Sequence, residues 1–416
     1  MSWNSQFNHD LVEKIKKVDT KISDVRMDLQ EIALTNQAKV LEAFRNNKLS
    51  ESHFAPSTGY GYDDMGRDAL EAVYAEVFQT EAALVRPQII SGTHAIATAL
   101  FGVLRPGDEL IYITGTPYDT LHEVIGTTGS GVGSFKEYNI GYQEVLLKED
   151  GSVDFDKVKA AISEKTKVIG IQRSRGYDSR PSFTVEKIAE MIAFVKDINP
   201  ELVVFVDNCY GEFAEIHEPT EFGADIMAGS LIKNPGGGIV KTGGYIVGRK
   251  DLVEKAAFRL TTPGVGGEGG AMLYSNHEMI QGFFLAPHVV SQAIQGAVFT
   301  AALLEEFDIS SIPKWNEPRT DLIQLISLKD KEKMVAFCQA VQKFSPIDAH
   351  VSPVPAYMPG YEDDVIMAAG TFIQGASLEL TADGPIRAPY ELYVQGGLTF
   401  EHVKIAVSQA VNDIFY

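Results

Sequence analysis

The sequence predicts an α/β fold in which helices cover a mostly parallel sheet, followed by a smaller α+β domain. Between about residues 66 and 260, short apolar runs alternate with segments of helical periodicity, a pattern typical of parallel sheets. Beyond residue 300, helices alternate with short strands. The expected organisation is an N-terminal helical arm over residues 1–55, a large domain over 56–305 and a small domain over 306–416.

The N-terminal arm is predicted by apolar residues that recur every three to four positions between residues 9 and 46. This periodicity indicates one long helix or a pair of helices. We expect the arm to pack on the chain's own core or on a partner subunit.

The other elements follow from the same periodicities. In the large domain, strands are expected at residues 109–113, 167–171, 202–206, 225–229 and 243–248, and helices at 67–79, 93–104, 184–197 and 250–260. In the small domain, strands are expected at 365–371, 377–380 and 391–395, and helices at 330–343 and 400–414. Ligands of parallel sheets bind at the carboxyl ends of the strands, so residues just past these ends are the candidates for a site.

Composition narrows the class of protein. The 416 residues are enough for two domains, and a hydrophobic content of 45% with 22% charged residues is ordinary for a soluble protein. A net charge of −20 argues against nucleic acid or an anionic membrane as partner, because both attract basic surfaces. Two cysteines and no apolar run approaching 18 residues favour a reducing compartment, and we expect the cytoplasm.

Two residues carry the chemistry that the sequence indicates. Asp207 ends the apolar run at 202–206, and Lys233 follows the run at 225–229 with the hydroxyl of Ser230 three residues before it. A lysine amine can condense with the aldehyde of pyridoxal phosphate (PLP), while a carboxylate keeps the pyridine nitrogen protonated. We therefore predict that Lys233 attaches PLP, that Asp207 faces the ring nitrogen and that Ser230 reaches the phosphate.

A phosphate site is predicted at Ser91, Gly92 and Thr93, which open the helix expected at 93–104. Small residues at a helix N-terminus offer backbone N–H groups and a positive dipole end to a phosphate. The alternative is an ordinary N-cap, for which serine and threonine are also preferred.

Four further residues are candidates near the same strand ends or in the small domain. Tyr118 could stack on the pyridine ring or be a surface residue of a turn. Arg173 and Arg175, just after the strand at 167–171, could bind the substrate carboxylate or form salt bridges. Arg387, in a loop bounded by prolines, could also clamp that carboxylate, because a guanidinium offers a planar fork, or could lie on the surface.

Two other ligand classes are not supported by the sequence. The segment Gly264–Gly269 matches G-x-G-x-x-G but follows Thr-Thr-Pro rather than a strand, so we interpret it as a loop at a subunit boundary and not as a dinucleotide site. Cysteines and histidines do not cluster with metal-ligand spacing, and no metal is expected.

The chain resembles a known family at these motifs. Val206-Asp207-Asn208, Glu221–Asp225 and Ser230-Leu-Ile-Lys233 are similar to the cysteine/methionine-metabolism PLP enzymes of fold type I. The resemblance is nearest to the methionine gamma-lyase-like, aluminium-resistance group, described as cystathionine beta-lyases, and it spans nearly the whole chain. It implies a PLP-dependent transferase-like fold with a mostly parallel sheet of the seven-stranded type.

The resemblance also implies shared active sites. In the family, a tyrosine before the phosphate site reaches the cofactor of a neighbouring subunit, and Tyr60 or Tyr62 would take this role here. The resemblance implies a homo-oligomer of active-site-sharing subunits, either a dimer or a homotetramer. The family's stacking tyrosine falls at Tyr118.

Two departures from the family concern the substrate pocket. Tyr393 occupies the place of the arginine that grips the substrate carboxylate, and Arg173-Ser174-Arg175 replaces a Glu-Ser-Pro-type segment. The expected function is a PLP-dependent carbon–sulfur lyase, either cystathionine beta-lyase-like or methionine gamma-lyase-like. Lys233 would abstract the Cα proton of the amino acid, with its pKa lowered by the site. The alternatives are an aminotransferase, an aldolase or a gamma-replacement enzyme, or a PLP-binding regulator without turnover.

Overall fold

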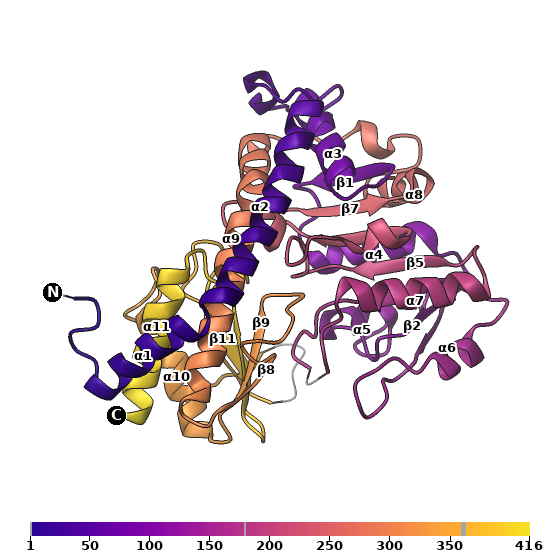
Figure 1. Cartoon of the computed structure of the whole chain (residues 1–416). Coiled ribbons are helices and arrows are strands. Elements are labelled where there is room, and N and C mark those ends of the chain that lie inside the picture. Colours follow the sequence, from indigo (N-terminus) through magenta and orange to yellow (C-terminus); the bar gives the residue numbers. More distant parts are fainter. Residues whose placement is uncertain (1, 179, 359–362) are drawn as a thin grey trace. The chain divides into compact units, whose positions relative to one another are not determined.

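The computed structural model describes residues 2–178, 180–358 and 363–416 (Figure 1). Its chain divides into two compact units, Ala38–Phe284 and Met1–Gln37 with Leu285–Tyr416. Both divisions fall inside long helices, α2 (Ser23–Asn46) and α9 (Ser275–Glu305). The boundaries expected from the sequence, after residues 55 and 305, lie at or beyond the ends of these helices, because a continuous helix gives no sequence signal where its packing partners change.

The unit Ala38–Phe284 is built on a seven-stranded sheet in the order β1-β7-β6-β5-β4-β2-β3. The strands are β1 (Ala82–Arg86), β2 (Glu109–Tyr112), β3 (Gly141–Glu144), β4 (Thr166–Gln172), β5 (Val203–Asp207), β6 (Ile226–Ser230) and β7 (Gly244–Gly248). Strand β7 runs antiparallel to both of its neighbours, and the other pairings are parallel. The predicted mostly parallel sheet is thus confirmed, and β1 and β3 are strands that the sequence analysis missed.

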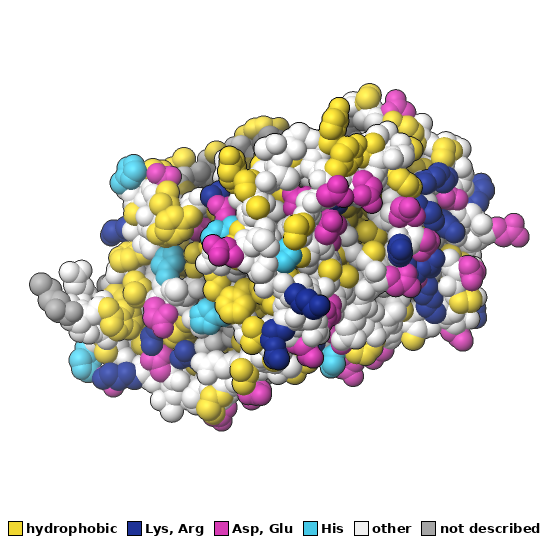
Figure 2. All heavy atoms as spheres, turned by 90° about the horizontal axis from the view of Figure 1, so that it is seen from above, with side chains coloured by type: hydrophobic (Ala, Val, Ile, Leu, Met, Phe, Trp, Pro, Cys, Tyr) yellow, Lys and Arg dark blue, Asp and Glu magenta, His cyan; other side chains and the backbone are white. Residues whose placement is uncertain are grey.

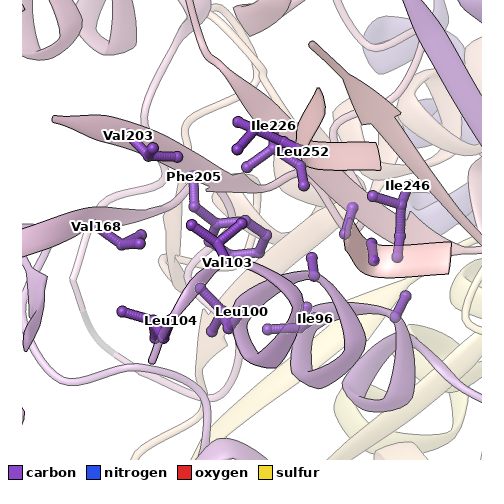
Figure 3. Close-up of a cluster of buried hydrophobic side chains, with 14 of the residues drawn as sticks. Ile96, Leu100, Val103, Leu104, Val168, Val203, Phe205, Ile226, Ile246 and Leu252 are labelled. Carbon is purple, nitrogen blue, oxygen red and sulfur yellow. The ribbon is translucent and has the colours of Figure 1, made fainter. Parts of the chain in front are cut away.

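Six α-helices accompany this sheet: α3 (Met65–Val77), α4 (Gly92–Val103), α5 (Asp119–Ile125), α6 (Phe155–Ala161), α7 (Val185–Ile198) and α8 (Lys250–Leu260). The core lies between one face of the sheet and helices α4 and α8. Alternate residues of β5, Val203 and Phe205, point into it beside Leu100 and Leu252 (Figure 3). All residues of β5 are buried, as expected of a strand covered on both faces.

The N-terminal arm is a pair of helices, which was one of the two alternatives predicted from the sequence. Helix α1 (His9–Lys21) begins at Asn8, whose side chain accepts a hydrogen bond from the backbone N–H of Asp10. A single residue, Ile22, separates the end of α1 from the start of α2. In α1, Leu11, Ile15 and Val18 recur at helical spacing and are buried.

The other unit contains an antiparallel sheet in the order β10-β11-β12-β9-β8. Its elements are β8 (Ser310–Ile312), β9 (Ile323–Ser327), α10 (Lys331–Lys343), β10 (Val365–Ala368), β11 (Thr381–Pro385), β12 (Glu391–Gln395) and α11 (Phe400–Phe415). The strand predicted at 377–380 is wrong, since the strand begins at Thr381. Glu379 instead accepts hydrogen bonds from the backbone N–H groups of Phe372 and Ile373, so this stretch holds a loop.

Candidate active site

All predicted cofactor residues except Tyr60 and Tyr62 meet in one cavity at the carboxyl ends of β2, β4, β5 and β6. Asp207 is the last residue of β5, Lys233 follows the end of β6, and Tyr118 precedes α5. The cavity has a volume of about 180 Å³. Seven predicted residues line it: Ser91, Gly92, Thr93, Tyr118, Asp207, Ser230 and Lys233.

Lys233 presents its amine to this cavity in close contact with an aromatic ring. Its Nζ lies 3.9 Å from the centroid of the Tyr210 ring. Burial by itself lowers the pKa of the Lys233 amine. The nearby ionisable groups of Cys209, Tyr210 and Asp207 outweigh burial and raise that pKa above its usual value. Desolvation acts in the direction expected from the sequence and these neighbours act against it, so the lowered pKa expected for this amine during catalysis stays a prediction.

Asp207 is a buried carboxylate supported by the backbone. Its Oδ1 accepts a hydrogen bond of 3.1 Å from the N–H of Cys209. Burial raises the pKa of the Asp207 carboxyl, while the positive charge of Lys233 and the bond from Cys209 act in the opposite direction. A protonated ring nitrogen opposite Asp207 would supply a positive charge that stabilises its ionised form.

The phosphate end of the cavity combines a helix N-terminus with a serine hydroxyl. Ser91 is the N-cap of α4, and its Oγ accepts from the N–H of His94. The Oγ of Ser230 is buried and has no hydrogen-bond partner among the described residues. A Cβ at Gly92 would lie 3.2 Å from the Cys209 sulfur and 3.4 Å from the Ser230 Cβ, so glycine keeps this corner open.

These groups fit PLP at each of its functional ends. Lys233 supplies the amine, Asp207 the buried carboxylate, and Ser230 a hydroxyl beside the N-terminus of α4. Tyr118 supplies an aromatic wall, and its backbone N–H donates to the Gln172 side chain over 2.7 Å. The unpartnered Ser230 hydroxyl is the clearest of these signs, because buried polar groups almost always have a partner.

The two arginines after β4 have different surroundings. Arg173 does not line the cavity; its guanidinium donates to Asn208 and pairs with Glu215 at 3.0 Å and Glu218 at 3.1 Å. Arg173 thus forms the salt bridges that were the alternative to substrate binding, and it does so in a buried position. These ion pairs argue against the substrate-binding role predicted for Arg173. Arg175 is also buried, but its Nε and Nη1 have no hydrogen-bond partner within the described part of the chain.

The remaining predicted residues lie on exposed segments. Tyr60 and Tyr62 are 78% and 56% exposed, and their rings stack on each other with centroids 5.5 Å apart. Arg387 follows β11 in the unit that holds the C-terminus, and its guanidinium is 3.8 Å from Asp363 with both side chains exposed. None of these three residues lines the cavity.

Seven lining residues were not predicted, and four of them carry a polar group on the side chain: Gln172, Ser174, Cys209 and Tyr210. Gln172 and Ser174 stand in the segment from which the arginines were chosen for their charge. Residues alternate in direction along an extended segment, so the uncharged neighbours face the cavity while Arg173 points away. Cys209 and Tyr210 come directly after Asp207-Asn208, and their position at a strand end was the available signal.

In the face shown in Figure 2, acidic and basic side chains are intermixed rather than gathered into patches of one sign. Among the described residues, no helix is long and apolar enough to cross a membrane. No group of three His, Cys, Asp or Glu side chains in the described ranges could hold a metal ion.

Comparison with solved structures finds close relatives over the whole length. A Listeria monocytogenes protein, presented as a candidate cystathionine beta-lyase involved in aluminium resistance, is 68% identical, with 97% of this chain and 99% of that chain covered and a TM-score of 0.96. A carbon–sulfur lyase involved in aluminium resistance from Clostridium novyi is 47% identical, covering 99% of this chain and 97% of that one, with a TM-score of 0.95.

More distant structures share the fold. The PLP-dependent protein YhfS from Escherichia coli is 16% identical and has a TM-score of 0.62, with 93% of this chain and 97% of that chain covered. The fold is therefore that of fold type I PLP enzymes. A family model described as methionine gamma-lyase matches residues 11–415. Because that match covers nearly the whole chain, this protein belongs to the methionine gamma-lyase family.

Proposed function

We propose that this protein is a PLP-dependent carbon–sulfur lyase that acts on a sulfur-containing amino acid. The observation that carries the proposal is the meeting of Lys233, Asp207 and an unpartnered Ser230 hydroxyl in one cavity beside the N-terminus of α4. Family membership and the lyase names of close relatives support the same reaction class.

The chain's own residues divide the chemistry between them. PLP, when bound, accepts electrons from the substrate's Cα so that a sulfur group can leave. Lys233 holds the cofactor and afterwards carries the Cα proton on its Nζ. Asp207, buried opposite, keeps the ring nitrogen protonated, and burial makes its charge effective because little water screens it. Tyr118 forms the aromatic wall on which the ring stacks.

The phosphate is held by residues from two elements. The N–H groups of Gly92 and Thr93, in the first turn of α4, would donate to the phosphate, and the dipole of the helix would favour its charge. Ser91 orders that turn through its N-cap bond, and Ser230 adds its free hydroxyl from the end of β6.

The substrate carboxylate is assigned to Arg175 rather than to Arg173. Arg173 already pairs with two carboxylates, so it has little capacity for a third. Among the described residues, the Nε and Nη1 of Arg175 are buried without a hydrogen-bond partner. Its side chain does not itself line the cavity, but its neighbours Ser174 and Gly176 do, so a small rotation of the guanidinium would be needed to reach the substrate. A buried guanidinium of this kind gains most from an anionic ligand. Arg387 is the alternative clamp.

The active unit is a homo-oligomer, at least a dimer, in which Tyr60 or Tyr62 reaches the phosphate of a neighbouring subunit. Both rings are exposed and stacked, which suits a surface that a second copy covers. We also expect a cytoplasmic location from the sequence.

The test is a screen of the purified protein against sulfur amino acids, measuring thiol, ammonia and 2-oxo acid. Cystathionine and cysteine report β-elimination, and methionine reports γ-elimination. Lys233→Ala should abolish product release and the borohydride-fixable PLP adduct, whereas Lys241→Ala, a lysine exposed on the same connection, should keep both. Transamination or aldol cleavage without thiol release would favour the alternative reactions, and an adduct surviving in Lys233→Ala would refute the assignment of Lys233.

A further inference from the structure

Tyr210 has a local geometry that none of the roles assigned above accounts for. Its ring lines the cavity and lies against the Lys233 amine, with Nζ 3.9 Å from the ring centroid. Its backbone has a φ of 72°, a left-handed conformation that is uncommon for a bulky residue. Such conformations persist only where the surroundings hold them, and they gather at functional sites.

The surroundings of Tyr210 hold it from two sides. The Nδ2 of Asn234, the residue after Lys233, donates to the backbone oxygens of Tyr210 over 2.9 Å and Glu212 over 2.8 Å. The Arg173 side chain packs against Gly211 of the same loop. A Cβ added at Gly211 would lie only 2.5 Å from the Cδ of Arg173. The loop is thus fixed to Asn234, the residue that follows the lysine contacted by the Tyr210 ring.

We infer that Tyr210 is a further positioning residue of the site, whose ring holds the Lys233 amine in place and stabilises its charged form whenever that amine is not bound to cofactor. The face of an aromatic ring carries negative electrostatic potential and attracts an ammonium group within about 6 Å. The inference rests on the proposed role of Lys233.

The other ionisable groups around Lys233 act on the same amine. Cys209 and Asp207 face it from the end of β5, and Tyr118 faces it from the segment after β2. Glu212, in the same loop as Tyr210, also interacts electrostatically with the Lys233 amine. Removing the ring of Tyr210 leaves all of these groups in place, so a change in the amine's behaviour can be traced to the ring.

The consequence is a measurable effect on cofactor attachment. A C=N bond forms between the amine nitrogen and the PLP aldehyde carbon as water leaves, and only the uncharged amine can react. Loss of a cation–π contact should lower the pKa of Lys233 by about 0.4 to 1.5 units. At a pH below that pKa, the uncharged fraction, and with it the attachment rate, should rise about 2- to 30-fold. A purely structural role predicts the opposite, because a loosened site would attach PLP more slowly.

The experiment uses full-length apoprotein, from which PLP has been removed with hydroxylamine, and follows the visible absorption as PLP is added back at pH 7 to 8. Tyr210→Asn is the main variant, because asparagine tolerates left-handed backbone. Tyr210→Leu is a second variant without a ring, and Tyr210→Phe keeps the ring. The matched control is Phe213→Leu, which changes another left-handed aromatic of the same loop (φ 62°) that does not line the cavity.

The inference requires faster attachment in Tyr210→Asn or Tyr210→Leu, with Tyr210→Phe within about twofold of the parent. Equal or slower attachment in both ringless variants, or an equal acceleration in Phe213→Leu, would overturn it. Lys233→Ala is run in parallel. If Lys233→Ala still attaches PLP, the proposed attachment site fails; if only the Tyr210 variants behave otherwise than expected, the inference about the ring fails alone.

Discussion

Replacing Glu212 by glutamine should make the protein more stable in alkaline solution. Glu212 is fully buried and lies in the same loop as Tyr210. Its Oε1 accepts a hydrogen bond of 2.6 Å from the Tyr245 hydroxyl, but its Oε2 has no partner among the described residues. Burial raises the pKa of Glu212 from its ordinary 4.5 to about 8, so the folded protein keeps this carboxyl protonated at neutral pH.

The sign and size of the effect follow from proton linkage. Between pH 4.5 and about 8 the folded state binds a proton that the unfolded state has lost, so stability falls as the pH rises through this window. The shift is about 3.5 units, and at roughly 1.4 kcal/mol per unit its upper limit is about 5 kcal/mol. Glutamine keeps the shape and the acceptor for Tyr245 but cannot ionise. Glu212→Gln should therefore match the parent near pH 5 and exceed it by a few kcal/mol at pH 9.

The assay is urea unfolding of both proteins at pH 5, 6, 7, 8 and 9, comparing the midpoints. Glu215→Gln is the control, because Glu215 lies in the same segment but pairs with Arg173, and its loss should destabilise at every pH. Parallel curves for Glu212→Gln and the parent, or a loss of stability at pH 9, would refute the reasoning, since Glu212 would then be ionised and compensated.

Three further predictions concern the site. Asp207→Asn should keep PLP bound but lower turnover by about 1.5 to 4 decades, from the roughly 2–5 kcal/mol that a buried charge partner is worth; activity within threefold of the parent would contradict this role. Arg175→Ala should raise KM about 10- to 150-fold with little change in PLP affinity, and Arg175→Lys should recover only part of it, whereas an unchanged KM would move the clamp elsewhere. Mixing inactive Lys233→Ala protein with an inactive Tyr60→Phe/Tyr62→Phe protein should restore activity, because one site of a mixed dimer regains both halves; no recovery after confirmed subunit exchange would exclude a shared site.

The sequence was sufficient where position along the chain decides the answer. Asp207 and Lys233 each follow an apolar run, and parallel strands bring their carboxyl ends to one edge, so their meeting could be predicted without coordinates. Ser91–Thr93 were predicted for another reason, because small residues open an expected helix there. The mostly parallel character of the sheet followed from the alternation of strands and helices, whereas its strand order was not predicted.

The sequence was insufficient where packing decides. Arg173 and Arg175 look equivalent in the chain, and only the carboxylates around Arg173 separate them. Thr381–Pro385 contains Asp, Gly and Pro, which disfavour strands, yet it pairs on both sides with β10 and β12. The tertiary contacts of a central strand outweigh these propensities. No pattern marks Tyr210 as a contact of Lys233, because its backbone conformation depends on bonds from Asn234.

The protonation of Glu212 bears on how an anionic cofactor can bind here. The chain carries a net charge of −20, and Asp207 already places one carboxylate beside Lys233. If Glu212 were also charged, the lysine would face two buried carboxylates, and a phosphate group entering the cavity would meet a net negative potential. A neutral Glu212 leaves one positive and one negative group, and the helix N-terminus then provides the attraction for the phosphate. Keeping Glu212 uncharged costs stability in alkaline solution, and Glu212→Gln should remove that loss. The urea unfolding curves of Glu212→Gln and the parent therefore also test whether Glu212 is neutral when the phosphate binds.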